Sequence, residues 1–215
     1  SLETIGNKAF YECPSLKSAD LPEALISIGN DAFRGTAISE VIIPAKMTTI
    51  GCYAYRDCLA LTKVSLGEQL TNWTEDWGHN GAFENCTALK TVFVESGVNS
   101  IGAYAFYGCT ALESIEVPNT SICVGEYAFA NCSSLKDAVV YRGIIENNAF
   151  ENCTALETLS IRKVTDIGNN AFRNASFEQI IVPNSVTHIG DYAFADLESM
   201  EARARVLSAV DGLPN

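Results

Sequence analysis

Residues 101–118 read IGAYAFYGCTALESIEVP, and variants of this motif occur about nine times along the 215-residue chain. Its landmark is an aromatic residue that in every copy follows an alanine. The aromatic positions are Phe10, Phe33, Tyr55, Phe83, Phe106, Phe129, Phe150, Phe172 and Phe194. A period of about two dozen residues is typical of a solenoid, in which each repeat buries its apolar face against its neighbours. We therefore predict one solenoid over residues 1–196, with about nine coils and a truncated first coil.

Each coil contains a short alternating segment that indicates a β-strand. In residues 112–117, Leu112, Ile115 and Val117 are apolar, whereas Ser114 and Glu116 lie between them. A period of two marks a strand with one buried face. Four coils end this segment with proline, at Pro22, Pro44, Pro118 and Pro183. Because proline cannot donate the next ladder hydrogen bond, we expect the chain to turn there and the strands to stack as one parallel sheet.

The other half of each coil predicts a tight turn around the Ala-aromatic pair. We expect a short turn or a 3₁₀ or helical segment there, with the rings stacked as a spine between coils. Residues that tolerate a left-handed backbone recur two positions after the aromatic. They are Gly35, Asp57, Asn85, Gly108, Asn131, Asn152, Asn174 and Asp196.

Six of the eight cysteines share one slot, three residues after the aromatic. They are Cys13, Cys58, Cys86, Cys109, Cys132 and Cys153. Small or apolar residues replace them in other coils, so we predict reduced thiols that pack in the core, although a disulfide framework is an alternative. Cys52 and Cys123 fall in outward slots and are expected to be exposed thiols.

The recurring phrase is Ile-Gly, two residues, Ala-Phe, two residues, Cys, two residues, Leu and a strand. It resembles the BspA-type leucine-rich repeat family over residues 1 to about 196. The resemblance implies an α/β repeat solenoid: a right-handed leucine-rich repeat arc with a parallel β-sheet on one face. It also implies a secreted or cell-surface protein, since members resemble bacterial and protozoan adhesins that bind host or bacterial proteins. The first residues already belong to a repeat, so we expect the chain to be part of a longer protein.

Two stretches break the pattern. The interval between Tyr55 and Phe83 is longer than the others and contains EQLTNWTEDWGHNGAF (residues 68–83). We expect Trp77 in the core, and Trp73 with His79 in a bulged loop that either contacts a ligand or is a tolerated insertion. After the last aromatic, residues 197–215 have helical periodicity and predict a capping helix, or else a tail.

Composition and charge restrict the function. With 26 acidic and 14 basic side chains, the net charge is −12, which disfavours nucleic acid and anionic lipid as partners. No apolar run approaches the ~18 residues of a membrane span. His79 and His188 lie about five coils apart, and Cys123, Asp166 and His188 share a column but not a catalytic distance. We expect no enzymatic activity, no cofactor and no metal site.

The outward face of the predicted sheet is the best candidate for binding. Apolar residues punctuate an otherwise polar surface there, as they do in protein interfaces, although β-propensity alone explains such residues too. The candidate partner-binding residues are Ile42, Phe93, Glu116, Val139, Ile181 and, in the loop, Trp73. We predict a monomeric, non-catalytic module that binds a protein or a glycan on a host or bacterial surface. The alternatives are a structural spacer and an ancillary module of a larger surface protein or enzyme.

Overall fold

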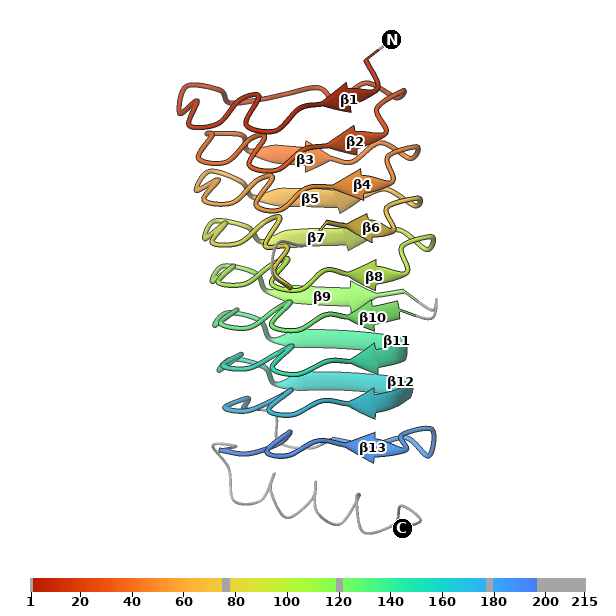
Figure 1. The fold of residues 1–215 in the computed structure, drawn as a ribbon. Helices are drawn as coiled ribbons and strands as arrows, with labels where there is room; N and C mark the ends of the chain where they lie inside the picture. Colours follow the sequence, from red (N-terminus) through yellow and green to blue (C-terminus); the bar gives the residue numbers. More distant parts are fainter. Residues whose placement is uncertain (1, 75–77, 119–121, 177–179, 197–215) are drawn as a thin grey trace.

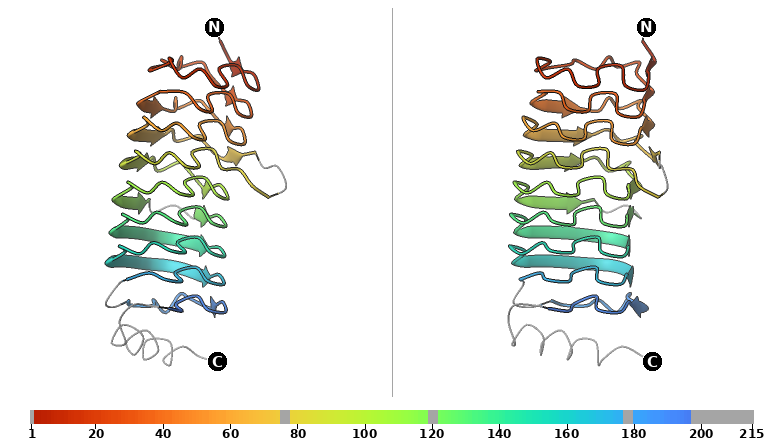
Figure 2. Two further views of the ribbon diagram at one scale, coloured as in Figure 1. Left: turned by 90° about the vertical axis from the view of Figure 1, so that its left-hand side faces the viewer. Right: turned by 60° about the vertical axis from the view of Figure 1, so that its left-hand side comes forward.

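The chain folds as a stack of parallel coils that run from the N-terminus to the C-terminus (Figure 1). The computed structural model describes residues 2–74, 78–118, 122–176 and 180–196. Residues 197–215, for which a capping helix or tail is predicted, lie outside this part of the chain. Side views of the ribbon show that consecutive coils have similar outlines and stack one above another (Figure 2).

Two ladders of short strands run along the stack. The first ladder contains the predicted alternating segments: β3 (Glu40–Ile42), β5 (Lys63–Leu66), β7 (Thr91–Val94) and β9 (Ser114–Val117). The second contains the Ile-Gly segments: β1 (Thr4–Ile5), β2 (Ser27–Ile28), β4 (Thr49–Ile50), β6 (Asn72–Trp73), β8 (Ser100–Ile101), β10 (Ile122–Val124) and β13 (His188–Ile189). All pairs within both ladders are parallel, as expected.

Two long strands, β11 (Asp137–Ile145) and β12 (Thr158–Ile167), belong to both ladders. They pair with each other, and β11 also pairs with β9 and β10, so nine strands form one sheet that turns a corner. β1, β2, β4 and β6 form a separate sheet of four strands. Where other coils have proline, β11 has Tyr141 and β12 has Arg162. Both residues have a backbone N–H, which permits the strand to continue around the corner.

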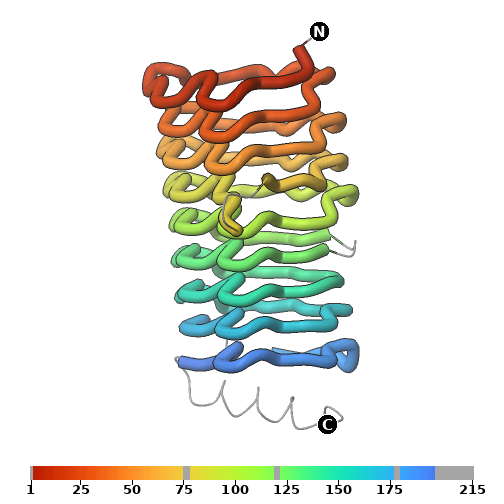
Figure 3. The backbone as a smooth tube through the Cα atoms, in the orientation of Figure 1, coloured from red at the N-terminus to blue at the C-terminus, as the bar shows by residue number. Residues whose placement is uncertain are grey.

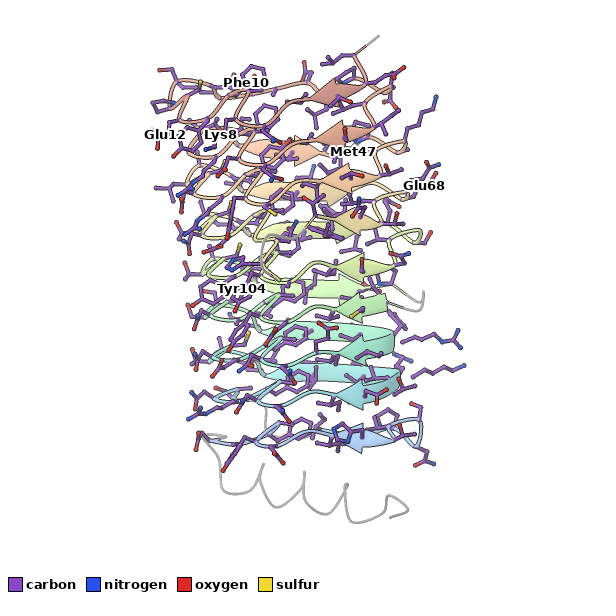
Figure 4. The ribbon with its side chains drawn as sticks, in the orientation of Figure 1. Lys8, Phe10, Glu12, Met47, Glu68 and Tyr104 are labelled. Atoms are coloured by element: carbon purple, nitrogen blue, oxygen red, sulfur yellow. The ribbon has the colours of Figure 1, made fainter. Side chains whose placement is uncertain are left out.

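The predicted aromatic spine forms the centre of the core. Consecutive rings are stacked face to face, with centroids 5.2 Å apart for Phe83 and Phe106 and 5.4 Å apart for Phe106 and Phe129. The rings from Phe33 to Phe172 are fully buried, whereas Phe10, labelled in Figure 4, ends the stack and is 39% exposed. Offset or stacked aromatic pairs add to the free energy of burial, so the spine joins each coil to the next.

The segment around the Ala-aromatic pair is not helical, and the expected 3₁₀ or helical segments are wrong: the described residues contain no helix. Every residue of the predicted left-handed column does have positive φ, for instance 60° at Asn131. A second left-handed column, unexpected from the sequence, lies two residues before the aromatic. It consists of Lys8, Asp31, Tyr53, Gly81, Tyr104, Tyr127, Asn148, Asn170 and Tyr192.

These two columns explain why no helix forms. Alternate N–H groups point to the next coil: Tyr104 donates to Glu126 (2.8 Å), Phe106 to Ala128 (2.8 Å) and Gly108 to Ala130 (2.9 Å). In an α-helix, each consecutive N–H group instead binds the carbonyl four residues earlier in the same segment. The segment therefore forms a third hydrogen-bonded ladder made of turns, visible as the superimposed loops of the backbone tube (Figure 3).

Five of the six cysteines in the shared slot form a column of thiols in the core, whereas the prediction of a buried thiol is wrong for Cys13, which is exposed in the first coil. From Cys58 to Cys153 each thiol donates to the carbonyl of the aromatic residue in an earlier coil, as Cys109 Sγ does to Phe83 O at 3.3 Å. Burial raises the pKa of Cys132 to about 12. The expectation of an exposed thiol is wrong for Cys52, which is 2% exposed and donates to Thr74 O (3.1 Å), and Cys123 is half-buried.

Candidate functional site

The outward side chains of the first ladder form a surface that we call the sheet face. Its register brings Ile42 of β3, Ser65 of β5 and Phe93 of β7 side by side. Ile42 is 60% exposed and Phe93 is 50% exposed. Because neighbouring strands are ~4.8 Å apart, these two apolar side chains lie about 10 Å apart with one small residue between them.

A pair of opposite charges borders Phe93. Lys63 Nζ lies 2.6 Å from Glu40 Oε1 and 5.7 Å from the centroid of the Phe93 ring. Exposed ion pairs add little to stability, but a cation near a ring face is attracted to it. The arrangement presents an apolar side chain with a polar rim, which is the composition of a protein interface centre.

The remaining predicted residues of the sheet face differ in their exposure. Glu116 of β9 is exposed and accepts a hydrogen bond from Tyr141 Oη (3.2 Å). Val139 of β11, aligned with Glu116, is half-buried. Ile181 is 74% exposed, lies beyond β12 outside any strand, and lines a cavity of about 900 Å³ with Thr158 and Ser160 among others. The structure therefore groups Ile42 with Phe93 and places Ile181 at the other end of the first ladder, beyond β12.

Trp73 does not belong to the sheet face or to a bulged loop, so that expectation is wrong. It lies in β6, where it pairs with Ile50 and occupies the slot of the recurring isoleucine. Its side chain is buried, its Nε1 donates to Ser100 O (2.7 Å), and its ring meets Phe106 edge-on at 6.5 Å. Trp77, for which this core slot was expected, lies outside the described residues.

A second surface, which the sequence analysis missed, lies along the turns. Tyr53, His79, Tyr104 and Tyr127 form a row of rings in which His79 stacks on Tyr104 with centroids 3.7 Å apart. His79 comes from the long fourth coil and fills the place that Gly81 leaves open. A Cβ at Gly81 would lie 3.0 Å from His79 Nε2 and 2.7 Å from Glu84 Oε2. The recurrence of tyrosine two residues before the aromatic was the available signal in the sequence.

Glu84 joins this row to the preceding coil. Its carboxylate is nearly buried, with Oε2 2.8 Å from His79 Nε2 and Oε1 3.2 Å from Arg56 Nη2. Burial raises the pKa of the neighbouring Tyr104 to about 12. Because the ring of His79 contacts those of Tyr53 and Tyr104, we interpret the row as a clamp for the inserted segment.

Titratable groups that could support chemistry are dispersed. His188 of β13 is aligned with Asp166 of β12, as predicted, and Cys123 lies two strands before Asp166 in the same column. The described residues contain no group of three or more His, Cys, Asp or Glu side chains that could hold a metal ion. In the same part of the chain, no helix has the length and apolarity needed to cross a bilayer.

The comparisons with known proteins point to one repeat family. The family model described as BspA type leucine rich repeat region matches residues 1–77 and 79–201 in six copies. No curated protein matches the chain.

The solved structures that are similar to the chain include two bacterial leucine-rich repeat proteins. A leucine-rich repeat protein from Treponema pallidum is 25% identical, with a TM-score of 0.62 over 72% of each chain. A leucine-rich cell surface protein from Faecalibacterium prausnitzii is 28% identical, with a TM-score of 0.56 over 74% of this chain and 48% of that one. This chain thus spans about half the length of the second protein. The phrase repeated along the sequence, the stacked parallel coils and the family match over most of the residues agree, and the chain belongs to the BspA-type leucine-rich repeat family.

Proposed function

We propose that this chain is a non-catalytic module that binds a protein partner through its sheet face. The observation that carries the proposal is the row of Ile42, Ser65 and Phe93, in which two exposed apolar side chains, on β3 and β7, flank one small residue on β5 of a polar sheet. Apolar anchors surrounded by polar groups provide most of the free energy of protein association. The parallel ladder fixes their spacing before binding, so little conformational entropy is lost on association.

The comparisons support a cell-surface location for this function. The similar protein from F. prausnitzii is named as a cell surface protein, and leucine-rich repeat modules commonly mediate protein interactions. We infer a position on the cell surface or outside the cell, where the partner is a protein of a host or of another bacterium.

A pull-down from host and bacterial surface extracts, followed by affinity measurement with the purified partner, tests the proposal. The test variant is Ile42→Asp with Phe93→Asp. The matched control is Ile26→Asp with Leu59→Asp, which changes two apolar residues, 44% and 62% exposed, that lie outside the sheet face. We expect the test variant to bind the partner at least about tenfold more weakly than the control, because interface anchors contribute at least 1–2 kcal/mol each.

Circular dichroism must show that both variants are folded. Equal affinity of both variants for the partner refutes the sheet face as the binding surface. A chain that captures no partner from any extract favours a structural spacer.

A further inference from the structure

The corner between the two ladders carries a concentration of positive charge. Arg142 of β11 is aligned with Lys163 of β12, and Arg162 precedes Lys163. All three side chains are exposed, and we call them the basic corner. They stand out in a chain whose net charge is −12.

The fold does not require these cations. The position aligned with Arg162 is occupied by proline in other coils, as at Pro44 and Pro118, and the coils there turn as well. Like charges that face each other on neighbouring strands are destabilising. In the described part of the chain, none of the three takes part in an ion pair, whereas Arg34, Arg56, Lys63 and Arg173 do. Arg162 lies over the ring of Tyr141, with Cζ 5.3 Å from the ring centroid, whereas the facing like charges of Arg142 and Lys163 break a local rule without such a contact, which is typical of binding sites.

The corner is also rigid and hollowed. Gly143 has φ of 115°, and a Cβ there would lie 1.8 Å from Ile122 O, so the strands approach closely at this point. A cavity of about 570 Å³ is lined by Arg142, Gly143, Ile144, Lys163, Thr165 and Ser185. This volume is enough for one or two sugar rings, since small-molecule sites start near 300 Å³.

The hydroxyl groups of the cavity add a second kind of recognition. Thr165 Oγ1 donates to Gly143 O (3.3 Å), and Ser185 Oγ donates to Val164 O (2.7 Å). Each hydroxyl proton is therefore used within the protein, and each oxygen is left to accept a hydrogen bond. A ligand that suits the corner has anionic groups for the cations and O–H donors for these oxygens.

We propose that the basic corner binds a sulfated glycan chain. Sulfates neutralise Arg142, Arg162 and Lys163, and sugar hydroxyls donate to Thr165 and Ser185. A slender linear chain fits a patch that is only two strands wide. Duplex nucleic acid or an anionic bilayer would bring the surrounding acidic surface into contact with further negative charge. The basic corner lies apart from the row of Ile42, Ser65 and Phe93, although Arg162 also lines the cavity beside Ile181, and it goes beyond the proposed protein-binding function.

Binding of fluorescent heparin octasaccharide to the purified chain tests the proposal. The test variant is Arg142→Gln, Arg162→Gln, Lys163→Gln. The matched control is Lys17→Gln, Lys46→Gln, Lys90→Gln, which removes three exposed cations that are dispersed along the solenoid. We expect the native chain and the control to bind heparin, and the test variant to bind at least about tenfold more weakly. The affinity of the native chain should fall with salt with a log–log slope of roughly −2 to −3, since each neutralised cation contributes about 0.7–0.9.

Two competitors decide the ligand class. Desulfated heparin and poly-glutamate should compete poorly. Equal competition by desulfated heparin overturns the role of sulfate, and equal competition by poly-glutamate assigns the corner to an acidic peptide instead. Absence of heparin binding, or equal binding by both variants, overturns the site.

The melting temperature of the test variant should equal or exceed that of the native chain, because like-charge repulsion is removed. The Ile42→Asp, Phe93→Asp variant should keep native heparin affinity, so the two proposals can fail separately.

Discussion

Shortening one ring of the aromatic spine should weaken the solenoid by an amount that depends on the position of the ring. Phe106 is fully buried, stacks on Phe83 and Phe129, and meets Trp73 edge-on. Replacing a buried phenylalanine by alanine costs about 3–5 kcal/mol, and each lost aromatic pair adds about 0.5–1.5 kcal/mol beyond burial. Because part of the pair energy is already contained in the measured range, we expect Phe106→Ala to cost about 5 kcal/mol.

Phe10 provides the matched comparison at the end of the stack. Its side chain is 39% exposed and has one stacked neighbour, Phe33, with centroids 4.9 Å apart. With less area buried and a single pair lost, Phe10→Ala should cost about 2 kcal/mol. Urea unfolding followed by circular dichroism measures both losses.

The difference between the two positions is the decisive result. In a solenoid, each coil is stabilised by its own contacts and by its nearest neighbours, so an interior coil loses two interfaces and a terminal coil loses one. Equal losses for Phe106→Ala and Phe10→Ala would refute this reasoning. If Phe106→Ala does not fold, Phe106→Leu retains part of the buried area and should still cost more than Phe10→Leu.

Three further predictions concern the turns, the clamp and the thiols. Tyr192 has φ of 57° and is 73% exposed, so Tyr192→Gly should be more stable than Tyr192→Ala by about 0.5–1 kcal/mol in thermal melts, and the opposite order would contradict the left-handed column. Glu84→Gln removes the nearly buried carboxylate that Arg56 and His79 share, while Arg56 keeps Asp57 at 3.5 Å, so we expect a cost of about 2 kcal/mol in urea unfolding, whereas a loss below about 0.5 kcal/mol would show that the clamp is unimportant. Burial raises the pKa of Cys132 from 9.0 to about 12, so the folded state holds this proton more tightly than the unfolded state. The thiol should resist iodoacetamide in the native protein, and unfolding free energy should fall as pH rises from about 9 to about 12, which melts across this range would detect.

The sequence predicts the structure of the coil well at positions where the same residue type recurs in most of the nine copies. The positions of the aromatic rings, the strands and one left-handed column all follow from residue types that recur at one spacing. The second left-handed column was not recognised because it contains Lys8, Tyr53 and Asn148 among others, residue types with no common backbone preference. Hydrogen bonds from the neighbouring coil impose that conformation, so tertiary structure overrides local preference at these positions.

Features that occur once in the chain are harder to predict. The fourth coil has two tryptophans and no repeat to align them, and the structure places Trp73 in the isoleucine slot that was expected for Trp77. In the same coil, Cys52 is buried and its thiol donates to the backbone carbonyl of Thr74, and His79 joins the row of tyrosines. The sheet face was predictable in its alternation, but the exposure of each side chain depends on its neighbours, which leave Phe93 exposed and Val139 half-buried.

The uniform stacking of coils has a consequence for how such a chain can change length. Hydrogen bonds from one coil to the next have the same pattern along the stack, and each coil presents the same groups above and below. A duplication or deletion of one whole copy at the level of the gene therefore leaves every remaining interface intact. Such an event between β7 and β11 would shift the basic corner relative to Phe93 by about one strand spacing, ~4.8 Å. The number of copies thus acts as a ruler that natural variation can adjust in fixed steps, without inventing a new surface.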